Sequence, residues 1–252
     1  MKETFENYIE AAKGKVKNIA SNTLVLAIFA GAFIAIAGVA STIASYSIEN
    51  VSIAKLLSAL VFPFGLILVV LFKTELFTGN CLLVIPLINK DIKFKDLIKN
   101  LVIVYIGNLI GAIIVVLMLK ISGHYENFTY LGAVLKIAQT KVSYSFLKSF
   151  VLGILCNILV CMAVLISFSV KTSGTKALVI FIPIFLFIML GLEHSVANMY
   201  YLASGYLNHG IGLRAILNNL IPVTLGNIVG GIGFGTIYYL INKKWEKISH
   251  FY

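Results

Sequence analysis

Long uncharged stretches, mostly apolar, alternate along the chain with short segments that carry its charged residues. Four of these stretches enclose 31, 20, 22 and 28 uncharged residues, at positions 18–48, 100–119, 149–170 and 215–242. A helix of about 20 residues crosses the ~30 Å hydrocarbon layer of a bilayer. Each stretch therefore predicts one membrane-spanning helix.

Two further regions have a different pattern. In the first, 17 uncharged residues at 56–72 are followed by 14 at 76–89, and in the second, 16 at 177–192 are followed by 14 at 195–208. Fourteen helical residues rise only about 21 Å, too little to cross alone. Turn-type residues mark the joints, Thr78-Gly79-Asn80 in one and Ser195 with Asn198 in the other. We therefore expect two interrupted passes, the second and the fifth of six, with four short passes as the alternative.

The basic residues favour six passes. With the N-terminus inside, thirteen Lys and Arg residues fall in inner segments and six in outer ones, with Lys73 at membrane depth. With eight passes, 12 Lys and Arg residues would fall inside and 8 outside, a weaker asymmetry. Inner loops of membrane proteins carry an excess of Lys and Arg. We expect an all-α integral membrane protein whose N- and C-termini are cytoplasmic.

Composition excludes the other broad classes. The chain is 60% hydrophobic and 12% charged, with a mean hydropathy of +0.98. Soluble domains carry about a quarter charged residues. Three cysteines in 252 residues exclude a disulfide scaffold, and the net charge of +10 is dispersed between apolar runs rather than gathered on one basic face. Membrane lipid is the expected surrounding, and no nucleic-acid partner is expected.

The chain reads as a single transmembrane domain, residues 1–252. Phe5, Tyr8, Ile9, Ala12, Val16 and Ile19 recur at helical spacing, so 1–20 is expected to be an amphipathic helix on the cytoplasmic surface, a frayed end being the alternative. The outer connection, 122–145, is the longest polar one, and 131–141 within it is expected to form a surface helix. The cytoplasmic tail is 243–252.

An internal repeat divides the membrane part into two halves, 21–121 and 146–242. Residues 100–111 align without gaps with 219–230, an offset of 119 residues that also carries Glu75 onto His194. Three passes per half, an odd number, force the halves into opposite orientations. Transport proteins built this way hold their substrate near the midplane, between broken helices.

The two breaks carry the candidate chemistry. Half-helix N-termini that face the midplane favour an anion, and Thr78 and His194 can donate hydrogen bonds to it. An intramembrane carboxylate needs a partner, for which Lys73, Lys141 and Asn157 are candidates. Glu75 and Glu193 could equally serve only to hold helices together, and His194 could instead make a structural hydrogen bond to the broken backbone.

Other residue types add less. Large apolar side chains near the breaks, Phe62, Leu66 and Phe187, are either ordinary core or lipid-facing residues or dry constrictions of a pore. Glycine pairs four residues apart, at 107 and 111 and at 226 and 230, allow close helix approach. The cysteines lack a CxxC spacing, and no metal-ligand, catalytic or cofactor constellation is present. No enzyme activity is expected.

Three segments resemble the formate/nitrite transporter family. They are Leu76-Phe77-Thr78-Gly79-Asn80 after the Gly-Leu-Ile-Leu of 65–68, the segment 155–164 around Asn157, and Glu193-His194-Ser195-Val196-Ala197-Asn198-Met199-Tyr200. The resemblance is collinear from about residue 20 to residue 240. It implies an aquaporin-like fold of six helices with broken second and fifth helices, and a homopentamer with one pore per protomer in the bacterial cytoplasmic (inner) membrane.

The resemblance also implies roles for individual residues. An outer constriction would be formed by Phe62, Val160 and Phe187, an inner one by Leu66, Leu76 and Phe77, with His194, Thr78 and Asn198 between or beside them and with Lys141, Asn157 and Glu193 as a polar network beneath the outer vestibule. Lys141 would attract anions and help a weak-acid anion take up a proton. The sequence departs from the family pattern at Lys73 and at Pro63.

These observations predict a channel or transporter for small monovalent weak-acid anions: hydrosulfide, formate or nitrite. The segment Thr78-Gly79-Asn80 is closer to the hydrosulfide-type members than to the formate ones, so we expect hydrosulfide first. Transit as the anion and transit coupled to a proton both stay open. A neutral-solute channel of aquaglyceroporin type is the alternative, although its Asn-Pro-Ala pair is missing. A structural or sensory protein with a closed pore is a third class.

Overall fold

The computed structural model describes residues 2–249, with side chains placed from residue 3 to residue 243, and the described part is helical without a strand. The helices are, in chain order, α1 (Lys2–Lys17), α2 (Ala20–Ser45), α3 (Val51–Val61), α4 (Phe64–Leu71), α5 (Phe77–Asn80), α6 (Val84–Ile88), α7 (Phe94–Ile121), α8 (Phe128–Val142), α9 (Phe146–Ser167), α10 (Ser173–Leu190), α11 (Ser195–Leu207) and α12 (Leu213–Ser249), with 3₁₀ turns η1 (Cys81–Leu83) and η2 (His124–Glu126).

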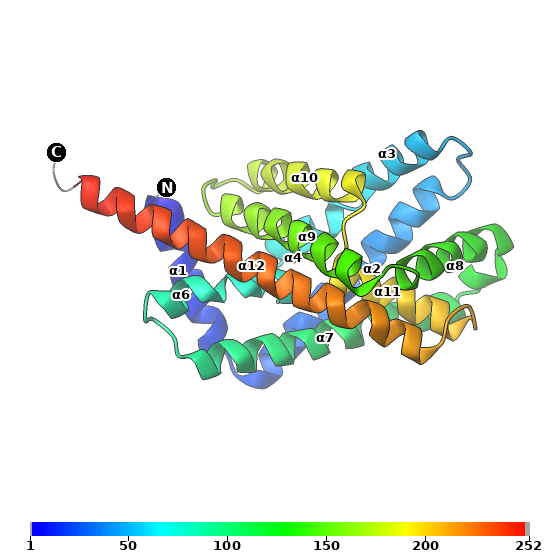
Figure 1. Cartoon of the computed structure of the whole chain (residues 1–252), viewed down its shortest axis with the longest axis horizontal. Coiled ribbons are helices and arrows are strands. Elements are labelled where there is room, and N and C mark those ends of the chain that lie inside the picture. Colours follow the sequence, from blue (N-terminus) through cyan, green and yellow to red (C-terminus); the bar gives the residue numbers. More distant parts are fainter. Residues whose placement is uncertain (1, 250–252) are drawn as a thin grey trace.

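Six helical segments of the described chain are long and apolar enough to cross a membrane. They are α2, α3 continued by α4, α7, α9, α10 and most of α12. The helix α1 and the C-terminal end of α12 lie at one end of the bundle and α8 at the other (Figure 1). The six spanning segments confirm the six-pass prediction over the alternative of eight.

The second and fifth passes are broken, as predicted, but not at the predicted residues. The second stops at Leu71 and resumes at Phe77, and the fifth stops at Leu190 and resumes at Ser195. Each first half ends in a left-handed residue, Lys73 with φ 52° and Gly191 with φ 66°. Thr78-Gly79-Asn80 and Ser195 with Asn198, predicted as the turns, instead begin the second half-helices. The prediction was wrong because the first joint contains no glycine, proline or asparagine to mark it.

Glycines bring the long helices together in pairs. A Cβ on Gly111 would lie 2.8 Å from the backbone nitrogen of Ala32 in α2, and one on Gly230 would lie 3.0 Å from Cα of Ile154 in α9. Both distances are too short for a side chain, so α7 packs closely on α2 and α12 on α9. The four-residue glycine spacing serves helix contact here, as expected for small residues in membrane proteins.

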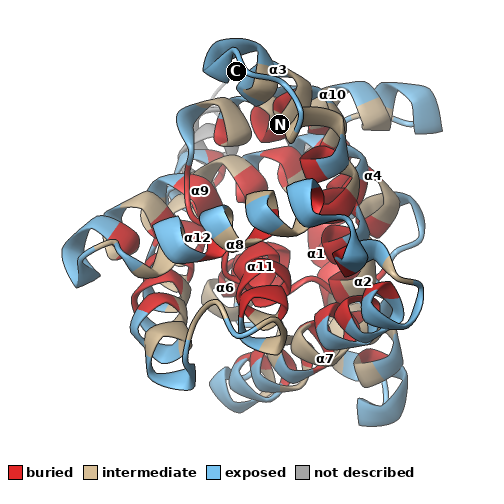
Figure 2. Cartoon of the chain, turned by 90° about the vertical axis from the view of Figure 1, so that its right-hand side faces the viewer, coloured by how far each residue is buried: buried red, intermediate tan, exposed pale blue. Residues whose placement is uncertain are grey.

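Burial follows a membrane pattern. In Figure 2, α11 lies at the centre of the bundle and is almost wholly buried, while the outer faces of the surrounding helices are exposed. Those outer faces are apolar, with Phe29, Val102, Leu155, Leu186 and Val229 all more than 40% exposed. Water would not tolerate so much contiguous apolar surface. Lipid, or other copies of the chain, must cover it.

The N-terminal helix α1 lies across one end of the bundle. Its apolar face is buried, with Phe5, Tyr8, Ile9 and Ala12 at 8% exposure or less. The ring of Tyr8 packs edge-on against Phe168, 5.4 Å between centroids. The apolar face that the sequence predicts for a membrane surface therefore covers the protein's own interior.

An ion pair fixes α1 to the loop before α7. Lys13 Nζ lies 2.7 Å from Asp91 Oδ1. Partial burial would raise the pKa of the Asp91 carboxyl, but hydrogen bonds from Lys13 and Asn89 outweigh it and hold the pKa below its ordinary value. At the opposite end, α8 covers the bundle, and the predicted surface helix 131–141 lies within it.

Candidate functional site

Two cavities enter the bundle, one from each end. The first, about 470 Å³, is bounded by α2, α3, α8, α10 and α11. The second, about 450 Å³, lies between α1, α4, the first break and the end of α9. We call them the outer and the inner cavity, after the orientation that the basic residues predict. They approach each other where the two broken helices resume.

A charged cluster forms one wall of the outer cavity. Lys141 Nζ donates to Glu193 Oε1 at 2.9 Å, and Asn198 Nδ2 donates to Glu193 Oε2 at 2.6 Å and to Asn219 Oδ1 at 2.8 Å. Glu193 is only 3% exposed, so an unpaired charge there would be costly. The structure thus pairs Lys141 with Glu193 and adds Asn198. Asn198 Oδ1 stays without a hydrogen-bond partner at the cavity wall.

The inner cavity has a matching cluster. Lys15 Nζ lies 2.9 Å from Glu75 Oε2, and Asn80 Nδ2 donates to Glu75 Oε2 at 2.6 Å and to Asn100 Oδ1 at 2.8 Å. Lys15 comes from α1, 60 residues before its partner in sequence. Lys73, which the sequence offered as a partner of a glutamate, lines the cavity and forms no ion pair with any residue that the structure describes.

Two asparagines from the long helices hold the broken backbones in place. Asn108 Oδ1 accepts from the N–H of Phe77 at 2.9 Å, while its Nδ2 donates to the carbonyls of Glu75 at 2.9 Å and Ala27 at 2.7 Å. Broken helices expose backbone groups that lipid cannot satisfy. Nothing in the hydrophobic pattern assigns Asn108 this task, although its conspicuous match with Asn227 in the aligned repeat was a usable signal.

Asn227 does the same at the second break. Its Oδ1 accepts from the N–H of Ser195 at 2.8 Å, and its Nδ2 donates to the carbonyls of Glu193 at 3.0 Å and Gly153 at 2.8 Å. Matching partners make Glu193, not His194, the equivalent of Glu75. The offset is 118 residues at the breaks and 119 at the asparagines, because the second half has one more residue between them. The gap-free alignment of 100–111 with 219–230 does not extend back to the breaks, so it did not show this extra residue.

The half-helices meet at Thr78 and His194. Thr78 Oγ1 lies 2.8 Å from His194 Nε2, and His194 Nδ1 accepts from the backbone N–H of Ala197 at 3.1 Å. A ring nitrogen that accepts carries no proton. The imidazole is therefore neutral in this arrangement, with its N–H on Nε2 directed at the Thr78 oxygen. The hydroxyl hydrogen of Thr78 is then free for another acceptor. His194 thus makes the bond to the broken backbone and also lines the outer cavity, and its role in a pore stays a prediction.

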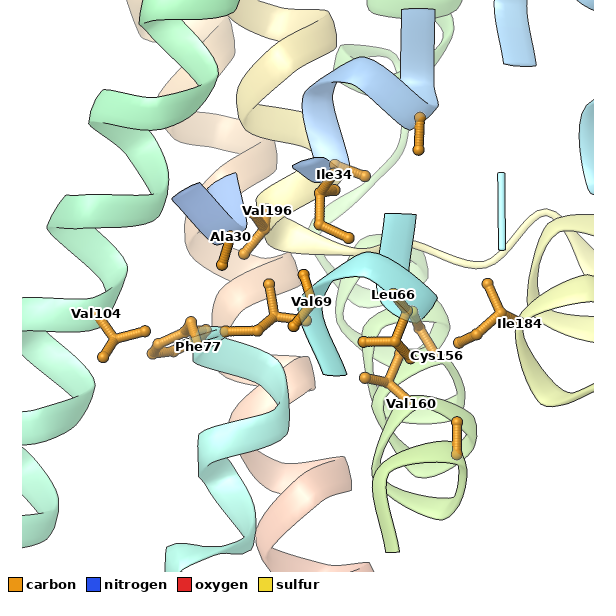
Figure 3. Packing of buried hydrophobic residues seen from close by; sticks show 14 of the residues in the cluster. Ala30, Ile34, Leu66, Val69, Phe77, Val104, Cys156, Val160, Ile184 and Val196 are labelled. Carbon is orange, nitrogen blue, oxygen red and sulfur yellow. The ribbon is translucent and has the colours of Figure 1, made fainter. Parts of the chain in front are cut away.

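Apolar side chains lie beside this pair. The rings of Phe62 and Phe187 meet edge to face, 5.6 Å between centroids, and Phe187 also lies 5.9 Å from the His194 ring. Both phenylalanines line the outer cavity, whereas Leu66 and Leu76 line the inner one. We call these four residues the septum; the buried Val160 lines neither cavity, and its place in a constriction stays a prediction. Figure 3 shows Leu66 and Val160 within one apolar cluster.

Two predicted site residues lie elsewhere. Asn157 does not join Lys141 and Glu193, because its Nδ2 donates to the carbonyl of Asn227 at 2.6 Å and so ties α9 to α12. The ring of Phe77 packs against Tyr105 of α7, 4.8 Å between centroids, and lines neither cavity. Its place in a constriction stays a prediction.

The arrangement can hold a small polar solute at each end and a single hydrogen-bonding pair between. Lysine side chains would attract anions, the paired carboxylates are neutralised by them, and an apolar septum would exclude hydrated ions. The chain has two inverted halves, two broken helices that meet at Thr78 and His194, and a cavity at each end. These features define a multi-pass membrane channel or transporter with an aquaporin-like fold.

Comparison with known proteins identifies the kind of channel. The family model described as formate/nitrite transporter matches residues 2–241, and the chain belongs to that family. It is 35% identical to "Formate channel FocA" of Escherichia coli strain K12, over 92% of this chain and 90% of that protein. It is 38% identical to "Uncharacterized transporter YrhG" of Bacillus subtilis strain 168, over 97% and 94%.

Solved structures agree with the sequence relatives. A structure described as "FNT family ion channel" superposes with a TM-score of 0.88 at 26% identity, covering 96% of this chain and 99% of the other. One described as "Pentameric formate channel with formate bound" gives a TM-score of 0.79 at 33% identity, over 88% and 97%. The resemblance recognised in the sequence motifs is confirmed. These relatives are named as channels or transporters, in keeping with a role that is not enzymatic.

Proposed function

We propose that this chain forms a pore for small monovalent weak-acid anions, one pore per protomer, in the bacterial cytoplasmic membrane. The single observation that carries the proposal is the Thr78–His194 pair, 2.8 Å apart, placed between two lysine-bearing cavities and beside an apolar septum. The end of the bundle that holds α1 is proposed to face the cytoplasm. By likeness to the pentameric relative, we also propose a homopentamer.

The lysines determine which solutes gather. Lys141 in the outer cavity and Lys15 in the inner one lie at the wall; Lys141 is bound to Glu193, and Lys15 to Glu75 and to Asn80 Oδ1. Each pair presents an ammonium group that still has a free N–H, since an ammonium has three donors. A small anion entering either cavity meets a hydrogen-bond donor before it meets the septum.

The septum determines the form in which the solute passes. An anion between the rings of Phe62 and Phe187 loses water that nothing apolar replaces, and a neutral acid loses far less. We propose that a weak-acid anion takes up a proton from the water of the cavity as it leaves the lysine, and so becomes neutral. The neutral His194 then supplies orientation, through the hydroxyl that it fixes on Thr78, rather than a proton of its own.

The substrate is the finer part of the proposal. Relatives named as formate channels make formate the first anion to test, ahead of the hydrosulfide that the segment Thr78-Gly79-Asn80 favoured and of nitrite. All three are monovalent conjugate bases of weak acids with few heavy atoms. A septum of this kind would exclude anything the size of a sugar.

Flux into proteoliposomes tests the proposal. Purified protein is reconstituted, and gradients of formate, hydrosulfide, nitrite, chloride and glycerol are imposed at pH 5.5 and pH 7.5. We expect flux of the weak-acid anions, no glycerol flux, and faster formate flux at the lower pH. Thr78→Val should reduce flux while Thr175→Val, in an exposed helix start outside both cavities, should not. Glycerol flux without anion flux would establish the aquaglyceroporin alternative instead.

A further inference from the structure

The inner cavity contains two lysines that neither the ion pairs nor the septum accounts for. Lys73 and Lys176 both line it, in addition to Lys15 and Glu75. Lys15 and Glu75 neutralise each other at 2.9 Å. Neither Lys73 nor Lys176 has a hydrogen-bond or ion-pair partner among the described residues. The cavity therefore carries two uncompensated positive charges.

Lys73 occupies a backbone position that does not suit it. Its φ is 52°, and the equivalent residue of the other half, 118 positions later, is Gly191 with φ 66°. Residues other than glycine are strained in this region, because Cβ crowds the carbonyl. Glycine would serve the turn better. Strain of this kind is a reason to look for a function of the side chain, and that side chain lies in the cavity wall.

A third donor completes the wall. Tyr8 of α1 is 1% exposed and lines the inner cavity, yet its hydroxyl makes no hydrogen bond to any described residue. The hydroxyl oxygen is not among the fully buried polar atoms that lack a partner, so it is accessible from the cavity that Tyr8 lines. Two lysines and one tyrosine that line one space of about 450 Å³ suit an oxyanion with several acceptor oxygens and two negative charges.

We propose that the inner cavity contains a binding site for a free multivalent oxyanion of the phosphate type, formed by Lys73, Lys176 and the Tyr8 hydroxyl. Such an anion cannot follow the monovalent substrate, because its two charges would have to leave water between apolar side chains. Bound at the inner mouth, it obstructs the pore from that side. The obstruction rests on the proposed pore function, but the binding does not.

Phosphate binding by the purified full-length protein tests the site. Binding is measured calorimetrically in detergent without added lipid, at pH 7.5, with ionic strength held constant by chloride. We expect wild type to bind inorganic phosphate, and Lys73→Gly to bind it at least about tenfold more weakly, since hydrogen bonds to charged groups are the strong ones. Glycine suits the local φ, so the fold should be retained.

Lys90→Gly is the matched control. Lys90 also has a left-handed backbone, with φ 65°, but lines neither cavity, so its replacement removes the same charge and should leave phosphate affinity unchanged. Tyr8→Phe should weaken binding while the ring still packs on Phe168. Absence of phosphate binding to wild type, or equal affinity of wild type and Lys73→Gly, would overturn the site.

Flux separates this inference from the pore itself. With phosphate on the inner side, formate flux should fall in wild type and Lys90→Gly but not in Lys73→Gly. Flux through wild type that phosphate leaves unchanged, despite binding, would overturn the obstruction. Binding without any anion flux in the absence of phosphate would refute the proposed pore and leave the phosphate site standing.

Discussion

Replacing Asn227 with leucine should loosen the second break without changing side-chain size much. The amide of Asn227 is fully buried and makes three bonds, to the N–H of Ser195 and to the carbonyls of Gly153 and Glu193, at 2.8–3.0 Å. Leucine makes none of them. The start of α11 would then lose the contact that fixes it, and with it the position of His194 opposite its partner hydroxyl.

The loss can be bounded from the structure. Single hydrogen bonds between membrane helices are worth about 0.6 kcal/mol on average and about 1.7 at most, and a buried polar group left unsatisfied costs about 1–3 kcal/mol. Three bonds lost together give roughly 2–5 kcal/mol. Asn108→Leu should lose a similar amount, because Asn108 makes the same three bonds at 2.7–2.9 Å in the other half.

Unfolding of the purified protein in detergent measures both losses, and formate flux in proteoliposomes follows the same variants. Asn242→Leu is the control, since Asn242 makes one local bond of 2.9 Å, to the carbonyl of Tyr238 within α12. If Asn227→Leu were no less stable than Asn242→Leu, the pinning of the break would be refuted. If the losses of unfolding free energy in Asn108→Leu and Asn227→Leu differed several-fold, the equivalence of the halves would be refuted.

Three further outcomes are expected. Lys141→Gln should destabilise the protein by about 3–5 kcal/mol, because Glu193 becomes a buried unpaired charge, and adding Glu193→Gln should restore most of that stability, as denaturation of the single and double variants would reveal. Gly111→Leu should fail to reach the membrane fold, since its side chain overlaps the α2 backbone, and a normal yield on gel filtration would contradict this. Asp91 has a lowered pKa, so its pairing with Lys13 stabilises the packing of α1 at pH values above the unfolded pKa of about 4, and this stabilisation is lost as pH falls through the lower folded pKa. Proteolysis of the α1 end should therefore increase only below about pH 4. In Asp91→Asn, which lacks the ion pair at every pH, proteolysis should show no such increase on acidification.

The hydrophobic pattern was enough to predict the passes. Uncharged stretches of 20 or more residues have one stable solution in lipid, a helix that satisfies its own backbone. The distribution of lysines then settled the number of passes, and the aligned segments 100–111 and 219–230 indicated opposite halves. Lys141 could be proposed as a partner of a glutamate, and Thr78 and His194 as hydrogen-bond donors, because they stand beside breaks where polar residues need partners.

The remaining features depend on contacts that no local pattern encodes. The first break lies at Lys73, where lysine takes a conformation typical of glycine, so the turn carries no sequence mark. The partner of Glu75 is Lys15, on a helix that reads as a surface element and that only the folded bundle brings beneath the pore. The sequence placed Asn157 in the membrane but did not show which face of its helix it occupies, and in the structure its amide donates to the carbonyl of Asn227.

The two cations identify a larger repeating unit than the membrane spans alone. Lys15 of α1 and Lys141 of α8 bind equivalent glutamates at the same distance, 2.9 Å, and they stand 126 residues apart. The same offset carries the Leu26-Ala27 pair, whose carbonyls accept near the first break, onto Leu152-Gly153 near the second. We therefore propose that each repeat begins with the helix that carries its lysine, α1 with Lys15 or α8 with Lys141. The predicted boundaries 21–121 and 146–242 then leave this helix out of each repeat. On this view α1 is an integral part of the first repeat. It supplies to the inner cavity the charge that α8 supplies to the outer one, and its removal would leave Glu75 buried and unpaired.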